Sequence, residues 1–192
     1  MTIAAPVLAA RILPRSRLAT LTAVVAFAGL TALAAQISFR IPPIEVPFTM
    51  QTLVVLLAGG VLGARTGAAS MILYLLAGLV LPVYAEQSKG VDVLKGTTGG
   101  YIIGFVVAAF VVGKMAERRH DREVLSAFAA FLIGSLVIYG FGVLGLMANA
   151  GLSLGEAVAG GVVPFVFWDI LKALGAGLVL PVAWRLTGDH TK

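Results

Sequence analysis

The sequence predicts an all-α integral membrane protein that folds as a compact bundle of six transmembrane helices, with its N and C termini in the cytoplasm. The first observation is composition: 59% of the 192 residues are hydrophobic and only 12% are charged, which is far from the balance of a soluble domain. The second is that the apolar residues form continuous runs of about 20 residues, the length of a spanning helix, and do not alternate as in a β-barrel. The third is that lysine and arginine gather in alternate connecting segments.

The first four helices are predicted from charge-free stretches that end at charged residues or turns. We expect these helices at about residues 18–39, 47–64, 67–84 and 97–113. The first stretch could instead be a cleaved signal peptide, but its apolar run of 22 residues exceeds the ~7–15 of a signal sequence, which favours a retained helix. The second and third helices are separated by little more than Gly63–Gly67, which predicts a tight antiparallel hairpin.

The last two helices come from a long charge-free stretch and from a segment with two charges. Residues 124–155 carry no charge and are too many for one simple span, so the turn at Asn149–Ser153 is expected to end a fifth helix of about 124–148. The sixth helix, about 160–184, is apolar except for Asp169 and Lys172. The chain is therefore predicted to be a single transmembrane domain, 1–192, with cytoplasmic segments at 1–17 and 185–192.

The distribution of lysine and arginine predicts the orientation, because cytoplasmic loops carry an excess of these residues. Three lie on one side of the predicted membrane: Arg40, Lys89 and Lys95. Ten lie on the other side: Arg11, Arg15, Arg17, Arg65, Lys114, Arg118, Arg119, Arg122, Arg185 and Lys192. The side with ten is predicted to be the cytoplasm. The basic segment Lys114–Glu123 is then a solvated loop that sets topology, and no nucleic acid partner is expected.

Two charges inside the sixth predicted helix indicate a functional site. An Asp or a Lys at the centre of a spanning helix costs about 2.5–3.5 kcal/mol on insertion, and such residues face the bundle interior or a wet cavity by default. A spacing of three places Asp169 and Lys172 on one helix face, which also carries Phe165 and Trp168. Because the chain enters this helix from outside, the pair is predicted to line a pocket that opens outward. The alternative is an ion pair that serves only packing.

Polar groups near the outer surface extend the predicted site. Pro47 is expected to start the second helix and to place Gln51 just below the outer surface. The outer loop 86–97 is the longest on its side and is a candidate lid. It leads into a turn where adjacent glycines let backbone amides approach a ligand and where a tyrosine offers a ring face or a hydroxyl, formed by Thr98, Gly99, Gly100 and Tyr101. A flexible turn with its tyrosine at the membrane interface is the alternative.

Four motifs, taken together, resemble one family. They are Val46–Leu53 (VPFTMQTL), Tyr74–Leu79 with the following Leu81–Val83, Thr98–Tyr101 (TGGY) and Trp168–Lys172 (WDILK). This order is similar to that of the BioY family, the biotin-binding substrate subunits (S components) of energy-coupling factor (ECF) transporters. The resemblance covers about residues 18–185. It implies a six-helix S component whose vitamin site lies on the outer side, capped by the loops after the first and third helices.

The resemblance also implies a ligand and partners. Biotin would use Asp169 as an acceptor for its ureido N–H groups, and Lys172 as a donor to the ureido carbonyl or as a partner of the carboxylate. Lys95 is a second candidate for the carboxylate. The apolar walls would come from Trp168, Phe165 and Tyr101. The implied protein partners are a transmembrane coupling subunit and two ATP-binding-cassette ATPases, in addition to membrane lipid.

Absent motifs limit the mechanism. The sequence has no G-x-x-x-x-G-K-[ST] phosphate loop, so we expect ATP to be used only by partner subunits. Cysteine is absent and His120 and His190 do not cluster, so no metal or cofactor is expected. Two alternatives remain open: a solitary, ion-coupled vitamin carrier that self-associates, and an S component for a different small vitamin. An enzyme is not expected, because the Asp–Lys pair lacks a second carboxylate or a Ser–His arrangement.

Overall fold

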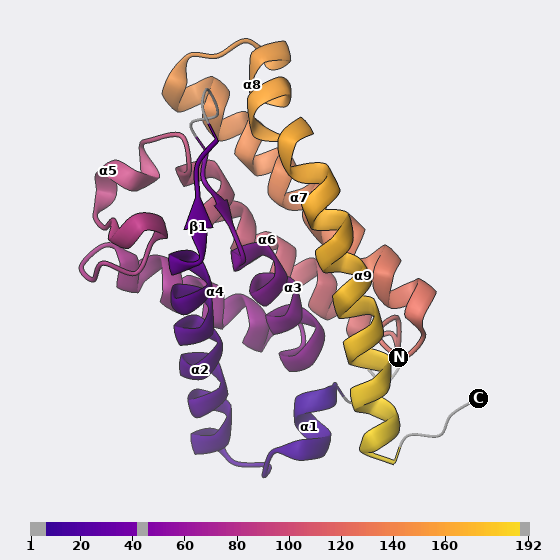
Figure 1. Cartoon of the computed structure of the whole chain (residues 1–192). Helices are drawn as coiled ribbons and strands as arrows, with labels where there is room; N and C mark the ends of the chain where they lie inside the picture. Colours follow the sequence, from indigo (N-terminus) through magenta and orange to yellow (C-terminus); the bar gives the residue numbers. More distant parts are fainter. Residues whose placement is uncertain (1–6, 42–45, 189–192) are drawn as a thin grey trace.

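The described helices end where glycine, proline or charged residues interrupt the apolar runs (Figure 1). The computed structural model describes residues 7–41 and 46–188. Its helices are α1 (Leu8–Ile12), α2 (Arg17–Gln36), α3 (Gln51–Leu62), α4 (Ala64–Gly78), α5 (Val91–Leu94), α6 (Gly99–Ala116), α7 (Val124–Ala150), α8 (Leu154–Gly161) and α9 (Val163–Leu186). The remaining described elements are a 3-10 turn, η1 (Ala85–Gln87), and two strands, β1 (Ser38–Phe39) and β2 (Phe48–Thr49).

Local sequence explains several helix ends. Ser16 caps α2, because its hydroxyl accepts a hydrogen bond from the Ala19 N–H at 3.1 Å. Ser153 and Glu156 form a capping box at the start of α8, and the hydrogen bonds from Ser153 lower the pKa of the Glu156 carboxyl. Gly63 is the single residue between α3 and α4, and its φ of 83° is a left-handed conformation that favours glycine.

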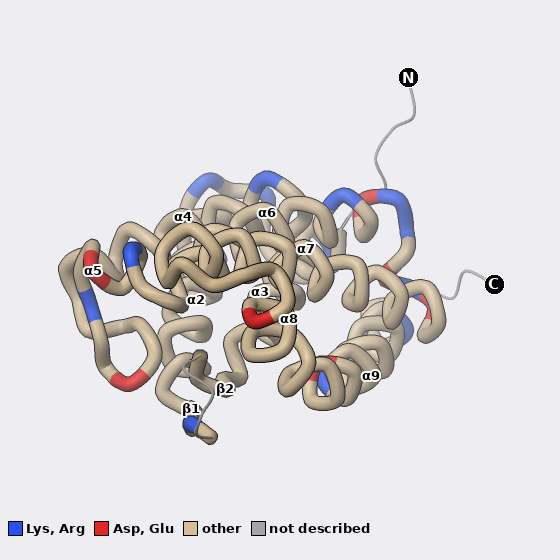
Figure 2. Tube along the Cα trace, turned by 90° about the horizontal axis from the view of Figure 1, so that it is seen from above, with Lys and Arg blue, Asp and Glu red and all other residues tan. Residues whose placement is uncertain are grey.

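Helix α6 is the centre of the bundle. It packs against α3, α4 and α7, and it is the most buried of the long helices, whereas α2 is the least buried. Close approach requires glycine at two contacts: a Cβ on Gly59 would collide with the Ala109 carbonyl oxygen, and one on Gly100 would lie 2.9 Å from the Gly145 Cα. Helix α9 packs mainly against α7, at the side of the bundle (Figure 2).

The two ends of the bundle carry different elements (Figure 1). The ribbon end carries β1, β2, α5 and α8. The opposite end, the α1 end, carries α1, the α3–α4 turn, the α6–α7 connection and the last turn of α9. At the α1 end, Trp184 Nε1 donates to Asp121 Oδ2 at 2.5 Å and the Ala64 N–H donates to Glu117 Oε1 at 3.0 Å. The charged residues lie mostly in the segments that connect the helices (Figure 2).

A two-stranded ribbon replaces the start of the predicted second helix. Strands β1 and β2 pair antiparallel, with Phe39 opposite Phe48, and the two rings stack with their centroids 5.1 Å apart. Helix α3 therefore begins at Gln51, and the expectation that Pro47 starts it is wrong. The described fold is mostly helical, and the short β1–β2 ribbon is the part that the all-α prediction did not include.

Other helix boundaries also differ from those predicted. Helix α4 ends at Gly78, whereas the predicted third helix continued to about 84; Pro82, which has no N–H, follows soon after. The predicted sixth helix is preceded by a separate short helix, α8. The break occurs at Val162, which has non-helical backbone angles, and Pro164 in the first turn of α9 favours a new helix start there.

Four helices in the described part of the chain, α2, α6, α7 and α9, are long and apolar enough to cross a membrane. Helices α3 and α4 have 12 and 15 residues, fewer than the about 20 that a lone straight span requires. Parts of the predicted terminal segments, residues 1–6 and 189–192, lie outside the described residues, as do residues 42–45.

Candidate functional site

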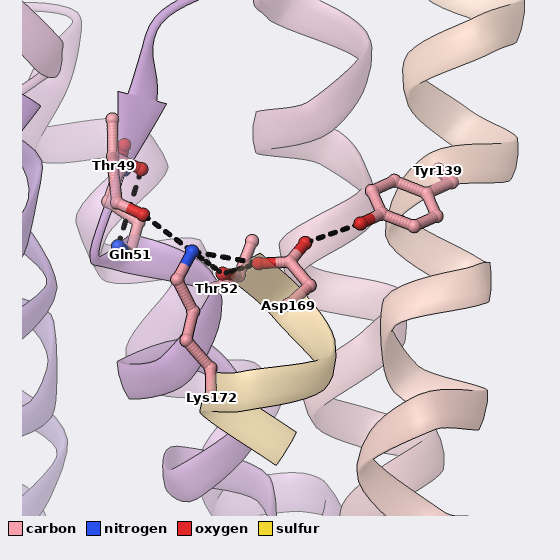
Figure 3. A network of polar contacts seen from close by, with 6 residues as sticks. All are labelled: Thr49, Gln51, Thr52, Tyr139, Asp169 and Lys172. Carbon is pink, nitrogen blue, oxygen red and sulfur yellow. Dashed lines mark hydrogen bonds and ion pairs between the residues drawn. The ribbon is translucent and has the colours of Figure 1, made fainter. Parts of the chain in front are cut away.

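Asp169 and Lys172 form the centre of a polar cluster inside the bundle (Figure 3). Lys172 Nζ donates to Asp169 Oδ1 at 2.7 Å, to Thr52 Oγ1 at 2.9 Å and to the Thr49 carbonyl oxygen at 2.8 Å. Asp169 Oδ1 also accepts from the Thr52 hydroxyl at 3.0 Å, and Asp169 Oδ2 accepts from the Tyr139 hydroxyl at 2.6 Å. These five residues, the Asp–Lys cluster, join α9 to α7, α3 and β2.

The cluster explains why α9 tolerates two charges. Asp169 is 5% exposed, so its carboxylate is removed from water. A buried ion pair is tolerated when further hydrogen bonds satisfy its remaining lone pairs and protons. Lys172 has three N–H groups and three acceptors, and both carboxylate oxygens of Asp169 have donors. The ion pair that the sequence left as an alternative is therefore formed, within a larger hydrogen-bond network.

A cavity lies beside the Asp–Lys cluster, at the ribbon end. We call it the ribbon cavity, because residues of the β1–β2 ribbon form part of its wall, together with residues of η1, α5 and the ribbon-end parts of α3, α4, α6 and α9. Its described lining residues are Arg40, Val46, Pro47, Thr49, Gln51, Thr52, Tyr74, Tyr84, Ala85, Ser88, Val93, Thr98, Tyr101, Ile102, Phe105 and Phe165. Thr49 and Thr52 belong to both the cavity wall and the cluster. The lining combines hydroxyl and amide groups with apolar side chains.

All four tyrosines of the chain lie at this site. Tyr74, Tyr84 and Tyr101 line the ribbon cavity, and Tyr139 belongs to the Asp–Lys cluster. Three of the hydroxyls donate to backbone carbonyl oxygens: Tyr74 to Val83, Tyr84 to Leu75 and Tyr101 to Gly161. The Tyr139 hydroxyl donates to the Asp169 carboxylate. A buried tyrosine offers an apolar ring and a fixed polar tip, so these residues give the cavity a rigid wall.

Four of the predicted site residues line the ribbon cavity: Gln51, Thr98, Tyr101 and Phe165. Gln51 is buried, and its Nε2 donates to the Tyr74 hydroxyl at 2.8 Å. Phe165 stacks on Phe48 of β2 with the ring centroids 4.3 Å apart. The structure therefore brings residues from α3, α6 and α9 together at one cavity.

Three other predicted site residues on α9 lie outside the described lining of the ribbon cavity. Asp169 and Lys172 do not belong to the described lining of the ribbon cavity; they lie behind Thr49 and Thr52. Trp168 does not line it either, since its side chain is 46% exposed and its ring contacts Phe167. The physical reason is that the buried stripe of α9 advances through residues 165, 169, 173, 176 and 180, which leaves residue 168 on the outer face.

Gly99, Gly100 and Lys95 are also absent from the described lining of the ribbon cavity. Gly99 and Gly100 are buried by other protein backbone: a Cβ on Gly99 would collide with Leu94, and Gly100 faces Gly145 of α7. These two glycines therefore permit close packing of α6 against Leu94 and Gly145. Lys95 is exposed and is not among the described lining residues.

Sequence reasoning missed several residues of the site, among them Arg40, Thr52, Tyr74, Tyr84 and Tyr139. Two of them carried a usable signal, because Tyr74 and Tyr139 each place a hydroxyl inside an otherwise apolar run, where it needs a partner. Arg40 was counted only as a cation of an outer loop, and nothing in its neighbours indicates that it reaches a cavity.

A family comparison decides the relationship: the model of the BioY family matches residues 8–189. The chain belongs to the BioY family. Among its BioY relatives, "Biotin transporter BioY" of Thermotoga maritima is 37% identical over 154 residues, covering 80% of this chain and 88% of that protein. "Probable biotin transporter BioY" of Pyrococcus horikoshii is 41% identical over 164 residues, covering 85% and 93%.

The BioY chain also shares its fold with a solved protein. A crystal structure of the S-component for biotin from an ECF-type ABC transporter matches with a TM-score of 0.80 and 22% identity, covering 88% of this chain and 92% of the other. At that identity the match shows the fold. Membership in a family of transporters, together with four helices suited to cross a membrane, makes the chain a multi-pass protein of the cell membrane.

Proposed function

We propose that this BioY chain captures biotin with high affinity and takes it up across the cytoplasmic membrane, as the substrate-specific subunit of an ECF-type ABC transporter. The observation that carries the proposal is the ribbon cavity, where hydroxyl and amide groups face apolar side chains and the Asp–Lys cluster stands behind. The names of the two relatives support biotin as the ligand. The solved protein of the same fold, an S-component for biotin, supports the role of a substrate subunit.

The chemistry of biotin suits this lining. Biotin has a ureido group with two N–H donors and one carbonyl acceptor, an apolar sulfur ring with an alkyl chain, and a carboxylate. The amide of Gln51 contains both a donor and an acceptor, and therefore complements a ureido group. Phe165 and Tyr101 supply ring faces for the apolar part. A ligand with one polar ring and one apolar chain can thus satisfy both kinds of wall.

The Asp–Lys cluster supports this binding by fixing a hydrogen-bond acceptor. The Thr52 hydroxyl donates its proton to Asp169 and accepts from Lys172. A ligand that reaches Thr52 from the cavity then meets an oxygen whose proton points away, which suits a ureido N–H. In this proposal Asp169 and Lys172 position Thr52 and Thr49. Direct contact of Lys172 with biotin requires the ligand to displace one of its three present hydrogen bonds.

Membrane topology is part of the proposal. We infer six crossings with both termini in the cytoplasm, so that the ribbon end faces outward and the basic α1 end faces inward. Helices α3 and α4 are short, but their neighbouring segments pack inside the bundle, where Phe48 and Tyr84 are buried. Non-helical backbone is tolerated at membrane depth when protein surrounds it. The segments around Phe48 and Tyr84 can therefore complete the two short crossings.

The proposed partners are a transmembrane coupling subunit and two ATPases, which use ATP on behalf of this chain. The test is uptake of radiolabelled biotin by cells that lack their own biotin uptake system and that express this chain alone or with the three partners. We expect uptake that requires ATPases with intact ATP hydrolysis. Uptake by the chain alone that an uncoupler abolishes would instead establish the solitary, ion-coupled carrier.

Competition distinguishes biotin from other vitamins. A tenfold excess of unlabelled biotin should remove bound label from the purified chain, whereas the same excess of thiamine or riboflavin should not. Stronger competition by another vitamin would show that the chain is an S component for that vitamin.

A further inference from the structure

Arg40 is the only charged residue among the described lining residues of the ribbon cavity. It follows directly after β1 and forms a two-point ion pair with Glu86 of η1: Nε lies 2.6 Å from Glu86 Oε1, and Nη2 lies 2.7 Å from Oε2. This geometry is the parallel fork with which a guanidinium binds a carboxylate. The cavity wall therefore already contains a carboxylate receptor, and a carboxylate of the protein occupies it.

The two lysines considered for a ligand carboxylate are less suited. Lys172 uses its three N–H groups on Asp169, Thr52 and Thr49, and Asp169 neutralises its charge. Lys95 is exposed and does not belong to the described cavity lining. Among the described lining residues, Arg40 is therefore the cation that a negatively charged group in the ribbon cavity would meet.

We propose that Arg40 binds the carboxylate of the transported ligand and that Glu86 holds Arg40 only while the cavity is empty. The inference rests on the proposed function, because it takes biotin as the ligand and adds which residue recognises its carboxylate. On binding, one carboxylate replaces another at the same guanidinium. The two-point ion pair of the guanidinium is kept with a new carboxylate, and Glu86 is released to solvent.

Replacement of Glu86 by the ligand carboxylate costs little, because the Arg40–Glu86 ion pair is weak. The side chains of Arg40 and Glu86 are 50% and 41% exposed, and ion pairs between exposed residues contribute on the order of 0–1 kcal/mol. A released Glu86 regains its hydration, whereas a biotin carboxylate comes to the arginine already held by the rest of the ligand in the cavity. The ligand carboxylate therefore competes with an advantage that Glu86 lacks.

The surrounding segment keeps Glu86 close to Arg40. Gln36 at the end of α2 donates from Nε2 to the Tyr84 carbonyl oxygen at 3.1 Å and accepts from the Gln87 N–H at 3.2 Å. These two bonds tie both sides of Glu86 to α2, so the glutamate remains a local competitor after its release. Removal of the Glu86 carboxylate should then favour binding of the ligand carboxylate to Arg40.

The test compares biotin with biotinamide, in which an uncharged amide replaces the carboxylate. Equilibrium binding to the purified full chain in detergent is measured for the wild type, Arg40→Gln and Glu86→Gln. We expect the wild type to bind biotin at least about tenfold more tightly than biotinamide. Arg40→Gln should weaken biotin binding by a similar factor and leave biotinamide binding unchanged, whereas Glu86→Gln should tighten biotin binding a few-fold and leave biotinamide unchanged.

Lys89→Gln is the matched control, because Lys89 is an exposed cation of the connecting segment that carries Glu86 and does not line the cavity. It should leave the binding of both ligands unchanged. The inference is overturned if Arg40→Gln weakens biotin and biotinamide equally, which would mean that Arg40 only holds the loop, or if Lys89→Gln has the same effect as Arg40→Gln. A wild type that prefers biotin no more than biotinamide also overturns it. A wild type that binds neither compound overturns the proposed function itself.

Discussion

At the scale of single residues, the main finding is that Asp169 and Lys172 act as a unit with two other side chains and one backbone carbonyl group. Thr52 and Tyr139 complete the hydrogen bonds of the carboxylate, and Thr49 accepts from the ammonium group. Because the pair lies behind the cavity wall, its influence on a ligand passes through Thr49 and Thr52. Whether that influence is real or the pair serves only packing is testable with two variants.

Asp169→Asn leaves Lys172 as an uncompensated charge inside the bundle. Removal of one partner of a buried pair costs about 3–5 kcal/mol, so we expect a clearly lower thermal unfolding temperature in detergent and at least tenfold weaker biotin binding. The double variant Asp169→Asn, Lys172→Met removes both charges and should recover most of the stability. If the pair positions Thr52 for the ligand, binding stays weak in the double variant; recovered binding would show a role in packing alone.

Part of this site could be predicted from the sequence. Two charges in an apolar run indicate a functional pair without any structure, because their insertion is costly. Tyr139 and Thr52 could not be assigned to it, since they lie 30 and 117 residues from Asp169 along the chain. The exposed position of Trp168 could not be predicted, because a residue three after Phe165 and four before Lys172 lies at the edge of their helix face. Only packing against α3 and α7 decides which side of α9 turns inward.

At the scale of elements, the contact between α6 and α7 is close because small residues meet there. Gly100 of α6 lies against Gly145 of α7, next to the turn that positions Thr98 and Tyr101 at the cavity. The adjacent glycines of this turn were interpreted from the sequence as a place where a ligand approaches the backbone. The structure shows that α7 approaches the backbone at Gly100.

Gly145→Ala should separate α6 from α7, since its Cβ would lie 2.7 Å from the Gly100 Cα. We expect a loss of about 1–3 kcal/mol in the free energy of unfolding and weaker biotin binding. Gly140→Ala is the control on the same helix, because no atom lies within 4 Å of its added Cβ. Thermal unfolding in detergent compares the two; equal unfolding temperatures would contradict the importance of this contact.

Glu117 links the α3–α4 turn to α6 and gives a pH dependence at the α1 end. Partial burial alone would raise the pKa of its carboxyl, but hydrogen bonds from Lys114 and the Ala64 N–H, with the charges of Lys114 and Arg65, lower it below its ordinary value of about 4.3. A lowered folded pKa means that the ionised form stabilises the fold. This contribution is complete above the ordinary pKa and is lost as the pH falls through the folded pKa.

Glu117→Gln should therefore be less stable than the wild type at pH 7, by about 1 kcal/mol or less, and the difference should shrink as the pH falls below about 4. Unfolding temperatures measured between pH 7 and pH 3 provide the comparison. A difference that stays constant over this range would show that ionisation of Glu117 does not contribute.

Most long helices were predictable because continuous apolar runs of about 20 residues have few alternatives. The shorter elements were not. The β1–β2 ribbon forms between segments that a single sequence cannot show to be paired, and it displaces the start of α3 from residue 47 to Gln51. The separate helix α8 depends on Val162 and Pro164, whose effect was hidden inside an apolar stretch.

At the scale of the whole molecule, we assign different tasks to the two ends of the bundle. The ribbon end contains the cavity and its Arg40–Glu86 pair, and the α1 end contains most of the lysine and arginine residues of the described chain. From this charge asymmetry we propose that the α1 end faces the cytoplasm.

Single cysteines test this orientation, because the chain has no cysteine of its own. Lys89→Cys at the ribbon end should react with a membrane-impermeant maleimide in intact cells. Arg118→Cys in the α6–α7 connection should react only after the membrane is permeabilised. Both residues lie in connecting segments outside the long apolar helices, so a reversed pattern would mean that the proposed orientation is inverted.

Binding of biotin in the ribbon cavity is the proposal on which the others depend, and equilibrium binding of radiolabelled biotin to the purified chain in detergent tests it. We expect saturable binding of one biotin per chain. Gln51→Leu should weaken it at least tenfold, because Gln51 lines the cavity, and Trp168→Leu should leave it unchanged, because Trp168 lies on the outer face of α9. An absence of saturable binding, or a loss in Trp168→Leu as large as that in Gln51→Leu, would contradict the proposal.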